Sequence, residues 1–442
     1  MPLRLDARTA DFPARFAGFL AARREAAADV DAVVAGILDD VRARGDAAVL
    51  EHTRRFDGIA LSADGMRVTA AEVDAALSAC DAGTLAALEL AAERIRAFHE
   101  RQRPSDLDFT DGAGVRLGWR WSPIAAIGLY VPGGSAAYPS SVLMNALPAK
   151  VAGCERLAMT VPAPRGRLDP LVLAAAHIAG VAEIHRIGGA QAIAALAYGT
   201  AKIAPVDKIV GPGNAYVAAA KRRVFGQVGI DMIAGPSEVV IVADGANDPA
   251  WIAADLLAQA EHDRAAQSIL ITGDAGFAEA VVGEVGRQVR ALSRRSIAEA
   301  SWRDNGCVIL IGSIEDEAPG LIDRLAPEHL QLALEDAAGL ATRVRNAGSI
   351  FLGRFTPETL GDYVAGPNHV LPTSRSARFS SGLGVLDFMK RSTFLGCNAA
   401  SLARLGPPAV ALAEAEGLGA HARSVAIRLD PRKADADRHS TP

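Results

Sequence analysis

Short apolar stretches alternate with segments of helical length over most of this chain, and this alternation limits the possible folds more than any other feature. The apolar stretches lie at 124–131, 156–161, 184–187, 207–210, 238–243, 267–272, 307–311 and 348–353. Consecutive parallel strands need a long crossover, which is usually a helix, so the sequence predicts βαβ units and parallel sheets. The units fall into two successive blocks, which predicts an α/β fold with two related α/β domains, although no repeat is evident residue by residue.

The two ends of the chain have a different texture. Residues 14–103 carry mainly Ala-rich helical patterns, such as 30–49 and 71–99. The tail from about residue 380 has a Ser/Gly segment, a helical pattern at 408–417 and an apolar stretch at 424–429 that favours a strand. Because the tail has too little apolar sequence for a core of its own, we expect it to pack on another part of the protein.

Composition excludes several classes of protein. At 442 residues, half of them hydrophobic, the chain can build two or three cored domains. Its net charge of -5 gives no electrostatic basis for binding nucleic acid. The 4 cysteines include no C-x-x-C pair, which disfavours a zinc ribbon and fits a reducing compartment. Without an apolar leader or an apolar run of about 18 residues, we expect a soluble, cytoplasmic protein that does not enter a membrane.

Three predicted strands end in glycines directly before a helix, at 133–134, 188–189 and in GPGN at 211–214. There the backbone can approach a phosphate closely, and the amides at the start of the helix can hold it. No G-x-G-x-x-G follows any strand, so the usual dinucleotide fingerprint is missing. Glycine at such positions can equally serve only the turn, and the pattern by itself leaves both interpretations open.

A predicted helix in the second block ends in two groups that commonly bind metals. Asp248 can cap this helix and Pro249 suits its first turn. Its apolar stripe continues into Gln259, and His262 follows about one turn later. Polar groups on a buried stripe need partners, and a metal ion is one candidate. A simple solvated helix end is the other.

A second polar pair, Glu328 and His329, stands between Pro327 and the alternating leucines 330, 332 and 334, which indicate a half-buried strand. Neighbouring side chains in a regular strand point to opposite faces. The pair can therefore share one site only from the loop after Pro327, and this is the arrangement that we expect. Otherwise Glu328 would cap a helix or face water.

Long stretches between 121 and 429 resemble the histidinol dehydrogenase family. They are YVPGGSAAYPSSVLMNALPAKVAG, GGAQAIAALAYGT, KIVGPGN, AGPSEV, DLLAQAEHD, APEHL, TPETLGDYVAGPNHVLPT, ARFSSGL and EGLGAH, in the family's order. The first hundred residues match more loosely. Arg375 is a departure, since the family more often has a small residue there, and it is expected to alter a surface near the tail.

The resemblance implies a role for each matching residue. The family's zinc ligands correspond to Gln259, His262, Asp362 and His421. Its acid–base pair corresponds to Glu328 and His329. Ser237 and Glu416 match substrate contacts, together with His329 and the zinc ligands. Tyr130, Gln191 and Asn214 match nucleotide contacts.

The resemblance also implies the activity and the assembly. The family oxidises L-histidinol to L-histidine through the aldehyde in two NAD-linked steps, with one zinc ion per subunit, at the end of histidine biosynthesis. It is a homodimer whose C-terminal tail completes the partner's active site. The implied fold is two Rossmann-like α/β domains with an N-terminal helical segment (1–24), a catalytic domain (25–129 with 237–380), a nucleotide-binding domain (130–236) and an exchanged tail (381–442).

The chemistry of these side chains agrees with the implied roles. Two His, one Gln and one Asp form a nitrogen and oxygen ligand set with a single negative charge, unlike the Cys-rich sites of structural zinc. Such a site can accept neutral nitrogen donors from a substrate. Asp255, one turn before Gln259, is either an acceptor that orients a ligand or a surface charge. Alcohol oxidation needs a base, which suits His329, and aldehyde oxidation also needs an activated water, which suits Glu328.

Three other functions fit parts of the pattern. A related branch of the family oxidises sulfonated diols, but the carboxylate of Glu416 suits an ammonium group and would repel a sulfonate. A zinc hydrolase fits the ligand set alone, and an absorbance assay at 340 nm with histidinol and NAD would separate it from a dehydrogenase. A non-catalytic binding protein would have no use for an acid–base pair.

Overall fold

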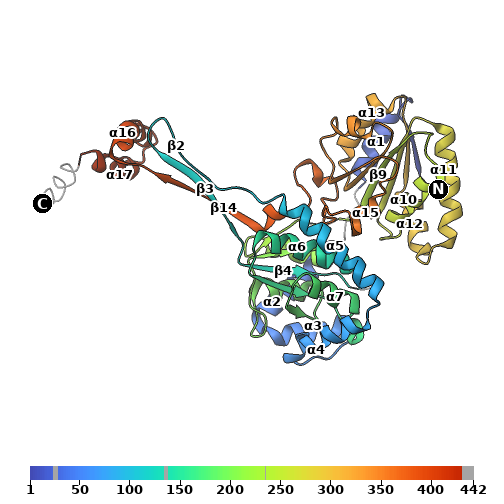
Figure 1. The fold of residues 1–442 in the computed structure, drawn as a ribbon, viewed down its shortest axis with the longest axis horizontal. Helices are drawn as coiled ribbons and strands as arrows, with labels where there is room; N and C mark the ends of the chain where they lie inside the picture. The colour runs from blue at the N-terminus through green and yellow to red at the C-terminus, as the bar shows by residue number, and fades with distance from the viewer. Residues whose placement is uncertain (23–27, 134–137, 234, 431–442) are drawn as a thin grey trace. The chain divides into compact units, whose positions relative to one another are not determined.

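The structure is a computed structural model that describes residues 1–22, 28–133, 138–233 and 235–430 (Figure 1). The chain forms two compact units. The first comprises Met1–Gln102 and Ile124–Phe388, and the second Arg103–Pro123 and Met389–Pro442. The first unit contains two parallel sheets with helices on them, which confirms the predicted α/β fold. The predicted glycine at 134 and the ends of the predicted segments 1–24 and 381–442 lie outside the described residues.

A six-stranded parallel sheet has the order β1-β11-β10-β9-β12-β13. Its strands are β1 (Leu3–Asp6), β9 (Glu238–Ala243), β10 (Gln267–Thr272), β11 (Cys307–Leu310), β12 (His329–Ala333) and β13 (Ser349–Leu352). Helices cover both faces, as a parallel sheet requires. The helices that belong with this sheet are α1 (Phe12–Ala21), α10 (Pro249–Ala260), α11 (Ala275–Gln288), α12 (Arg295–Asn305), α13 (Ile314–Leu325), α14 (Ala337–Ala341) and α15 (Glu358–Tyr363).

Alternate residues of each strand serve two separate cores. Val240 and Val242 pack with α1, α13 and α14 on one face, whereas Val239 and Ile241 pack with α10, α11 and α12 on the other. Figure 1 shows the two groups of helices on either side of β9. β12 is consequently buried along its whole length, so the prediction of a half-buried strand at 330–334 is wrong. The leucines meet one helical layer, and the residues between them meet the other.

A five-stranded parallel sheet has the order β6-β5-β4-β7-β8. Its strands are β4 (Ala126–Tyr130), β5 (Arg156–Thr160), β6 (Glu183–His185), β7 (Lys208–Val210) and β8 (Gly229–Ile230). The helices around it are α2 (Ala28–Arg44), α3 (Asp46–Asp57), α4 (Ala70–Ala79), α5 (Ala82–Glu100), α6 (Pro139–Ala152), α7 (Pro170–Ile178), α8 (Gly189–Tyr198) and α9 (Ala215–Val224). Short 3-10 turns occur at Asp64–Met66, Pro164–Gly166, Val289–Ala291, Ser376–Arg378 and Val385–Phe388.

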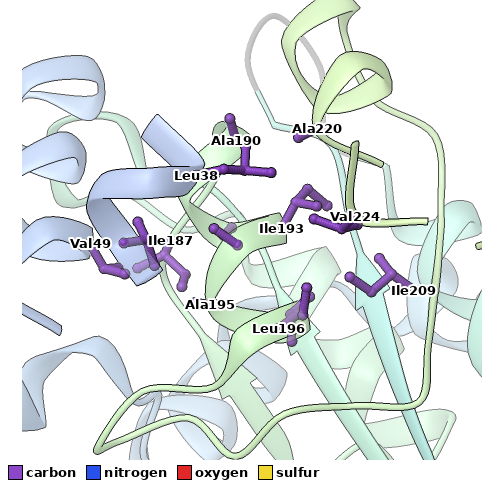
Figure 2. Packing of buried hydrophobic residues seen from close by; sticks show 14 of the residues in the cluster. Leu38, Val49, Ile187, Ala190, Ile193, Ala195, Leu196, Ile209, Ala220 and Val224 are labelled. Carbon is purple, nitrogen blue, oxygen red and sulfur yellow. The ribbon is translucent and has the colours of Figure 1, made fainter. Parts of the chain in front are cut away.

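The core of this second sheet is rich in alanine and branched residues. Figure 2 shows Ile193 and Leu196 of α8 between Leu38 of α2, Ile209 of β7 and Val224 of α9, and all five belong to one buried cluster. The small side chains of α8 allow its neighbours to approach closely. These contacts place the helices α2 and α3 on this sheet. The functional division into catalytic and nucleotide-binding domains stays a prediction.

The second unit consists of an antiparallel sheet and two helices. The sheet order is β14-β3-β2, with β2 (Leu107–Thr110), β3 (Arg116–Pro123) and β14 (Met389–Gly396). The helices α16 (Ala399–Ala415) and α17 (Gly419–Leu429) pack on each other. The close packing depends on Gly406 of α16, since a Cβ there would lie 2.8 Å from side-chain carbons of Leu429.

One prediction at the C-terminal end of the chain is wrong, and one at the N-terminal end is incomplete. Residues 424–429 form the end of α17 rather than a strand. A short apolar run is compatible with either a helix or a strand, and here the contact with α16 favours the helix. The N-terminal segment contains β1 as well as helix, since residues 3–6 pair with β11. No single described helix is long and apolar enough to cross a membrane, although α4 and α5 pass that test as a pair bent by 114°.

Candidate active site

A buried polar cluster lies at the amino edge of the six-stranded sheet, where α10 and α15 pack over β12. β12 contributes His329, the turn after α10 contributes His262, and α15 contributes Asp362. The Nε2 atom of His329 lies 3.6 Å from Oδ1 of Asp362. His262 lies near enough to both residues for their charges to affect its pKa. The structure therefore brings together side chains that are far apart in the sequence.

His329 is surrounded by carboxylates. Its Nδ1 atom is 3.1 Å from the backbone oxygen of Glu238, 3.7 Å from Oε2 of Glu328 and 3.8 Å from Oε2 of Glu358. Burial alone would lower the pKa of His329, but the charges of Glu328, Glu358 and Asp362 outweigh it and raise this pKa. The surrounding carboxylates therefore favour the protonated form of the His329 imidazole.

Glu328 shares the site with His329 although the two are adjacent in sequence. Ala326, in the left-handed region at φ 47, ends α13, and Glu328 lies in a bend before β12. Its Oε2 atom accepts the backbone N–H of Glu238 at 2.8 Å. His329 is already the first residue of β12, so only Glu328 has the predicted loop position. Burial raises the pKa of Glu328 to about 7.

Gln259, His262 and Asp362 have the properties of metal ligands. Gln259 is 1% exposed, and its amide nitrogen has no hydrogen-bond partner in the described chain. Burial lowers the pKa of His262, which favours the neutral imidazole. Burial opposes ionisation of Asp362, but His329 outweighs it and lowers the pKa of this carboxyl group. Among the described residues, no group of three or more His, Cys, Asp or Glu side chains is placed to hold a metal ion.

The cap of α10 matches the prediction, and its inner face holds a further contact. The side chain of Asp248 accepts the N–H of Ala250 at 2.8 Å, with Pro249 at the start of the helix. Asp255 is not a surface charge, because its Oδ2 atom accepts a hydrogen bond from Nε2 of Gln331 at 2.7 Å. Burial raises the pKa of Asp255.

Two residues of the cluster were not among the predicted site residues. Glu358 is 1% exposed, and burial raises its pKa to about 8. It lies four residues before Asp362 on α15, so helical spacing could have identified it. Gln331 lies two residues after His329 on β12, so the period of a strand could have identified it in the same way.

The predicted substrate contacts lie in both units. Ser237 immediately precedes β9, and its carbonyl accepts the N–H of Gln267 at 2.9 Å. It is therefore at the same edge of the sheet as His329. Glu416 follows α16 and His421 lies in α17, so both belong to the second unit, and both are exposed.

Tyr130, Gln191 and Asn214 are at the carboxyl edge of the five-stranded sheet. The chain runs from β4 towards β6 and then returns to β7 on the other side of β4, so β4 and β7 flank the point where the strand order reverses. Ligands of open α/β sheets bind at this position. Tyr130 ends β4 and accepts the N–H of Gly189 at 3.0 Å, while Asn214 caps α9. The Oε1 atom of Gln191 is buried without a partner in the described chain.

The GPGN loop between β7 and α9 requires glycine. Gly211 has φ 114, and a Cβ at this position would lie 2.1 Å from the backbone oxygen of Tyr130. Below the loop, Lys221 of α9 forms a buried ion pair with Asp231. Lys221 Nζ also donates to the backbone oxygen of Gly211 at 2.9 Å. The carboxylate of Asp231 accepts the backbone N–H of Gly211 at 2.8 Å. The loop is thus fixed from both sides.

Fold and site together define an α/β enzyme with acid–base side chains beside a set of metal-type ligands. The family model of histidinol dehydrogenase matches residues 20–429. The histidinol dehydrogenase of Rhodospirillum rubrum is 66% identical over 97% of this chain and 99% of its own, and that of Rhodopseudomonas palustris 63% identical over 98% and 100%. The crystal structure of histidinol dehydrogenase from Elizabethkingia anophelis is 35% identical with a TM-score of 0.92, covering 98% of this chain and 99% of that one.

The chain therefore belongs to the histidinol dehydrogenase family, and it is an oxidoreductase of histidine biosynthesis. This result confirms the resemblance that the sequence motifs indicate.

Proposed function

We propose that this protein oxidises L-histidinol to L-histidine through the aldehyde, in two steps that each use NAD. The observation that carries this proposal is the buried His329, with Glu328 and Asp362 within 3.7 Å, in a chain of the histidinol dehydrogenase family. An imidazole next to a carboxylate of raised pKa is suited to moving protons near neutral pH.

We propose one zinc ion per subunit, held by Gln259, His262, Asp362 and His421. The buried side chain of Gln259, whose amide oxygen can coordinate a cation, the neutral His262 and the ionised Asp362 fit an ion that prefers nitrogen and oxygen donors. When bound, zinc supplies a positive charge that attracts the nitrogen donors of the substrate.

The two oxidations place different demands on the acid–base pair. In the first, the neutral form of His329 takes the hydroxyl proton of the alcohol at an imidazole nitrogen as the hydride leaves. In the second, Glu328 takes a proton from the water that adds to the aldehyde, and the protonated His329 gives its proton to the carbonyl oxygen. His329, neutral again, then takes the hydroxyl proton of the hydrate as the second hydride leaves. The backbone N–H of Glu238 orients Glu328 for this role. NAD supplies the acceptor for each hydride, and Tyr130, Gln191 and Asn214 would line its site.

We propose a homodimer in which the second unit of one chain completes the active site of the other. The side chains of His421 and Glu416 are both exposed in this unit. Glu416 would bind the ammonium group of histidinol by charge, which disfavours a sulfonated substrate.

NADH yield from histidinol tests the proposal. We expect about two NADH per histidinol consumed. A chelator should abolish the activity and added zinc should restore it, since the ligand set predicts about one zinc per chain. Full activity in protein shown to be metal-free would exclude the zinc site, and a lack of NADH with histidinol would exclude the reaction.

A further inference from the structure

A cavity lies on the face of the six-stranded sheet that is opposite the acid–base cluster. Its volume is about 370 Å³, which is the size of a small-molecule site. Phe19 of α1, Leu325 of α13 and Ile269 of β10 form an apolar wall. Arg375 and Arg378 line the cavity from the loop that follows α15. Glu238 lines it as well, and its Oε1 atom accepts the N–H of Ser374 at 3.3 Å. The cavity thus combines an apolar surface with two guanidinium groups and one carboxylate.

Arg375 is incompletely paired in this cavity. Its Nε atom is buried and has no hydrogen-bond partner among the described residues. Burial, and then the charges of Arg378 and Arg324, lower the pKa of Arg375 against the weaker opposing effect of Glu238. A buried donor of a cation without an acceptor is costly, and an anion would remove that cost.

The backbone holds Arg375 in this position. Ser374 and Arg375 both have positive φ, at 53 and 65, which is rare for residues other than glycine. Thr373 fixes the turn, because its Oγ1 atom accepts the N–H of Gly235 at 2.6 Å and its carbonyl accepts the N–H of Ser376 at 3.0 Å. Strained backbone that is held by its surroundings is common at binding sites.

We propose that this cavity binds a small oxyanion, a phosphate or carboxylate, carried on a short apolar body. The guanidinium of Arg375 would hold the oxyanion in the two-pronged manner that arginine favours, with Arg378 adding charge. The wall formed by Phe19, Ile269 and Leu325 would cover the apolar part. The site is separate from the proposed nucleotide loops, which belong to the other sheet.

Calorimetric titration of the full-length protein with phenyl phosphate at constant ionic strength tests this proposal. We expect one saturable site per chain, with inorganic phosphate binding several-fold more weakly because it leaves the apolar wall unused. Arg375→Met should weaken phenyl phosphate binding about tenfold or more, since it removes a charge-assisted contact but keeps the side chain's length. Arg343→Met, at an exposed arginine after α14, is the matched control and should bind like the unmodified protein.

Phenyl phosphate could bind in the arginine cavity or at the glycine loops of the five-stranded sheet, and a variant at the loops distinguishes these two sites. Asn214→Ala should keep phenyl phosphate binding if the probe occupies the arginine cavity. If Asn214→Ala loses binding while Arg375→Met keeps it, the probe occupies the glycine loops and the proposal is wrong. Absence of saturable binding would also overturn it. If Arg375→Met does not fold, the same comparison can be made with Arg378→Met, since Arg378 is exposed.

Discussion

Replacing Lys221 with Met should destabilise the five-stranded sheet and loosen its GPGN loop. The side chains of Lys221 and Asp231 are 2% and 1% exposed, so their charges are almost fully removed from water. Met has a similar length and keeps the packing of the aliphatic stem. The substitution therefore removes a charge and a donor while leaving the shape of α9 nearly unchanged.

The structure sets the expected size of the effect. Removing one member of a buried ion pair typically costs about 3–5 kcal/mol, because the remaining charge is left without its partner. Asp231 keeps two donors, the N–H groups of Gly211 at 2.8 Å and Met232 at 2.6 Å, which favours the lower part of this range. The carbonyl of Gly211 loses its donor from Lys221, which adds about 1 kcal/mol. We expect a total loss of about 3–4 kcal/mol.

Urea unfolding followed by circular dichroism measures this loss. Arg222→Met, at the exposed neighbour of Lys221 on α9, is the control and should change the free energy of unfolding by less than about 0.5 kcal/mol. If Gly211 contributes to nucleotide binding, Lys221→Met should also raise the KM for NAD more than it lowers kcat. A loss below about 1 kcal/mol for Lys221→Met would show that the ion pair does not hold this loop.

Three further predictions concern the proposed site and the pH dependence of stability. In single-turnover NADH formation, Glu328→Gln should slow aldehyde oxidation more than alcohol oxidation, and equal losses would mean that Glu328 does not act on water. His329→Asn should slow both oxidations by about 10²–10⁴-fold. Gln259→Ala and His421→Ala homodimers should each be nearly inactive, whereas mixed dimers should regain up to one working site, since both lesions can fall in one site; co-refolded mixtures without recovery would refute shared sites. Burial opposes ionisation of Glu183, but its bonds to His185 and Arg156 outweigh this and lower the pKa of Glu183 to about 2. Glu183 therefore stabilises the fold above its unfolded pKa of about 4.5, and this stabilisation is lost as the pH falls towards 2. In unfolding experiments at different pH, Glu183→Gln should remove about 1–3 kcal/mol of the pH-dependent free energy of unfolding. An unchanged dependence of that free energy on acidic pH would contradict this prediction.

The central strands and α10 could be predicted because their signals are local. β9 and β10 have the predicted bounds, and each contains a run of buried apolar residues, 239–243 in β9 and 269–271 in β10. Asp248 and Pro249 give the start of α10 through capping chemistry that needs no tertiary information. Long runs and caps of this kind identify an element before its neighbours are known.

Elements that depend on distant partners could not be predicted. β14 is mostly exposed and has no apolar alternation, and it is a strand only because it pairs with β3, far away in the sequence. β1 has four residues and likewise depends on its pairing with β11. For the same reason, spacing alone could not join Gln259 to Asp362, and only the resemblance to a known family grouped them.

The polar residues of β12 are best explained by function rather than by folding. His329, Gln331 and Ala333 occupy successive positions on the same face of the strand, beneath α10 and α15. Ala333 belongs to the apolar cluster on this face, so the strand can pack there without polar groups. His329 and Gln331 instead bring polar atoms into a buried space, and four carboxylates, those of Glu328, Glu358, Asp362 and Asp255, accompany them. Apolar residues of similar size would stabilise such an interior at least as well. Imidazole, amide and carboxylate groups therefore occupy this interior because they serve proton transfer at a site. This is expected for an oxidoreductase of this family.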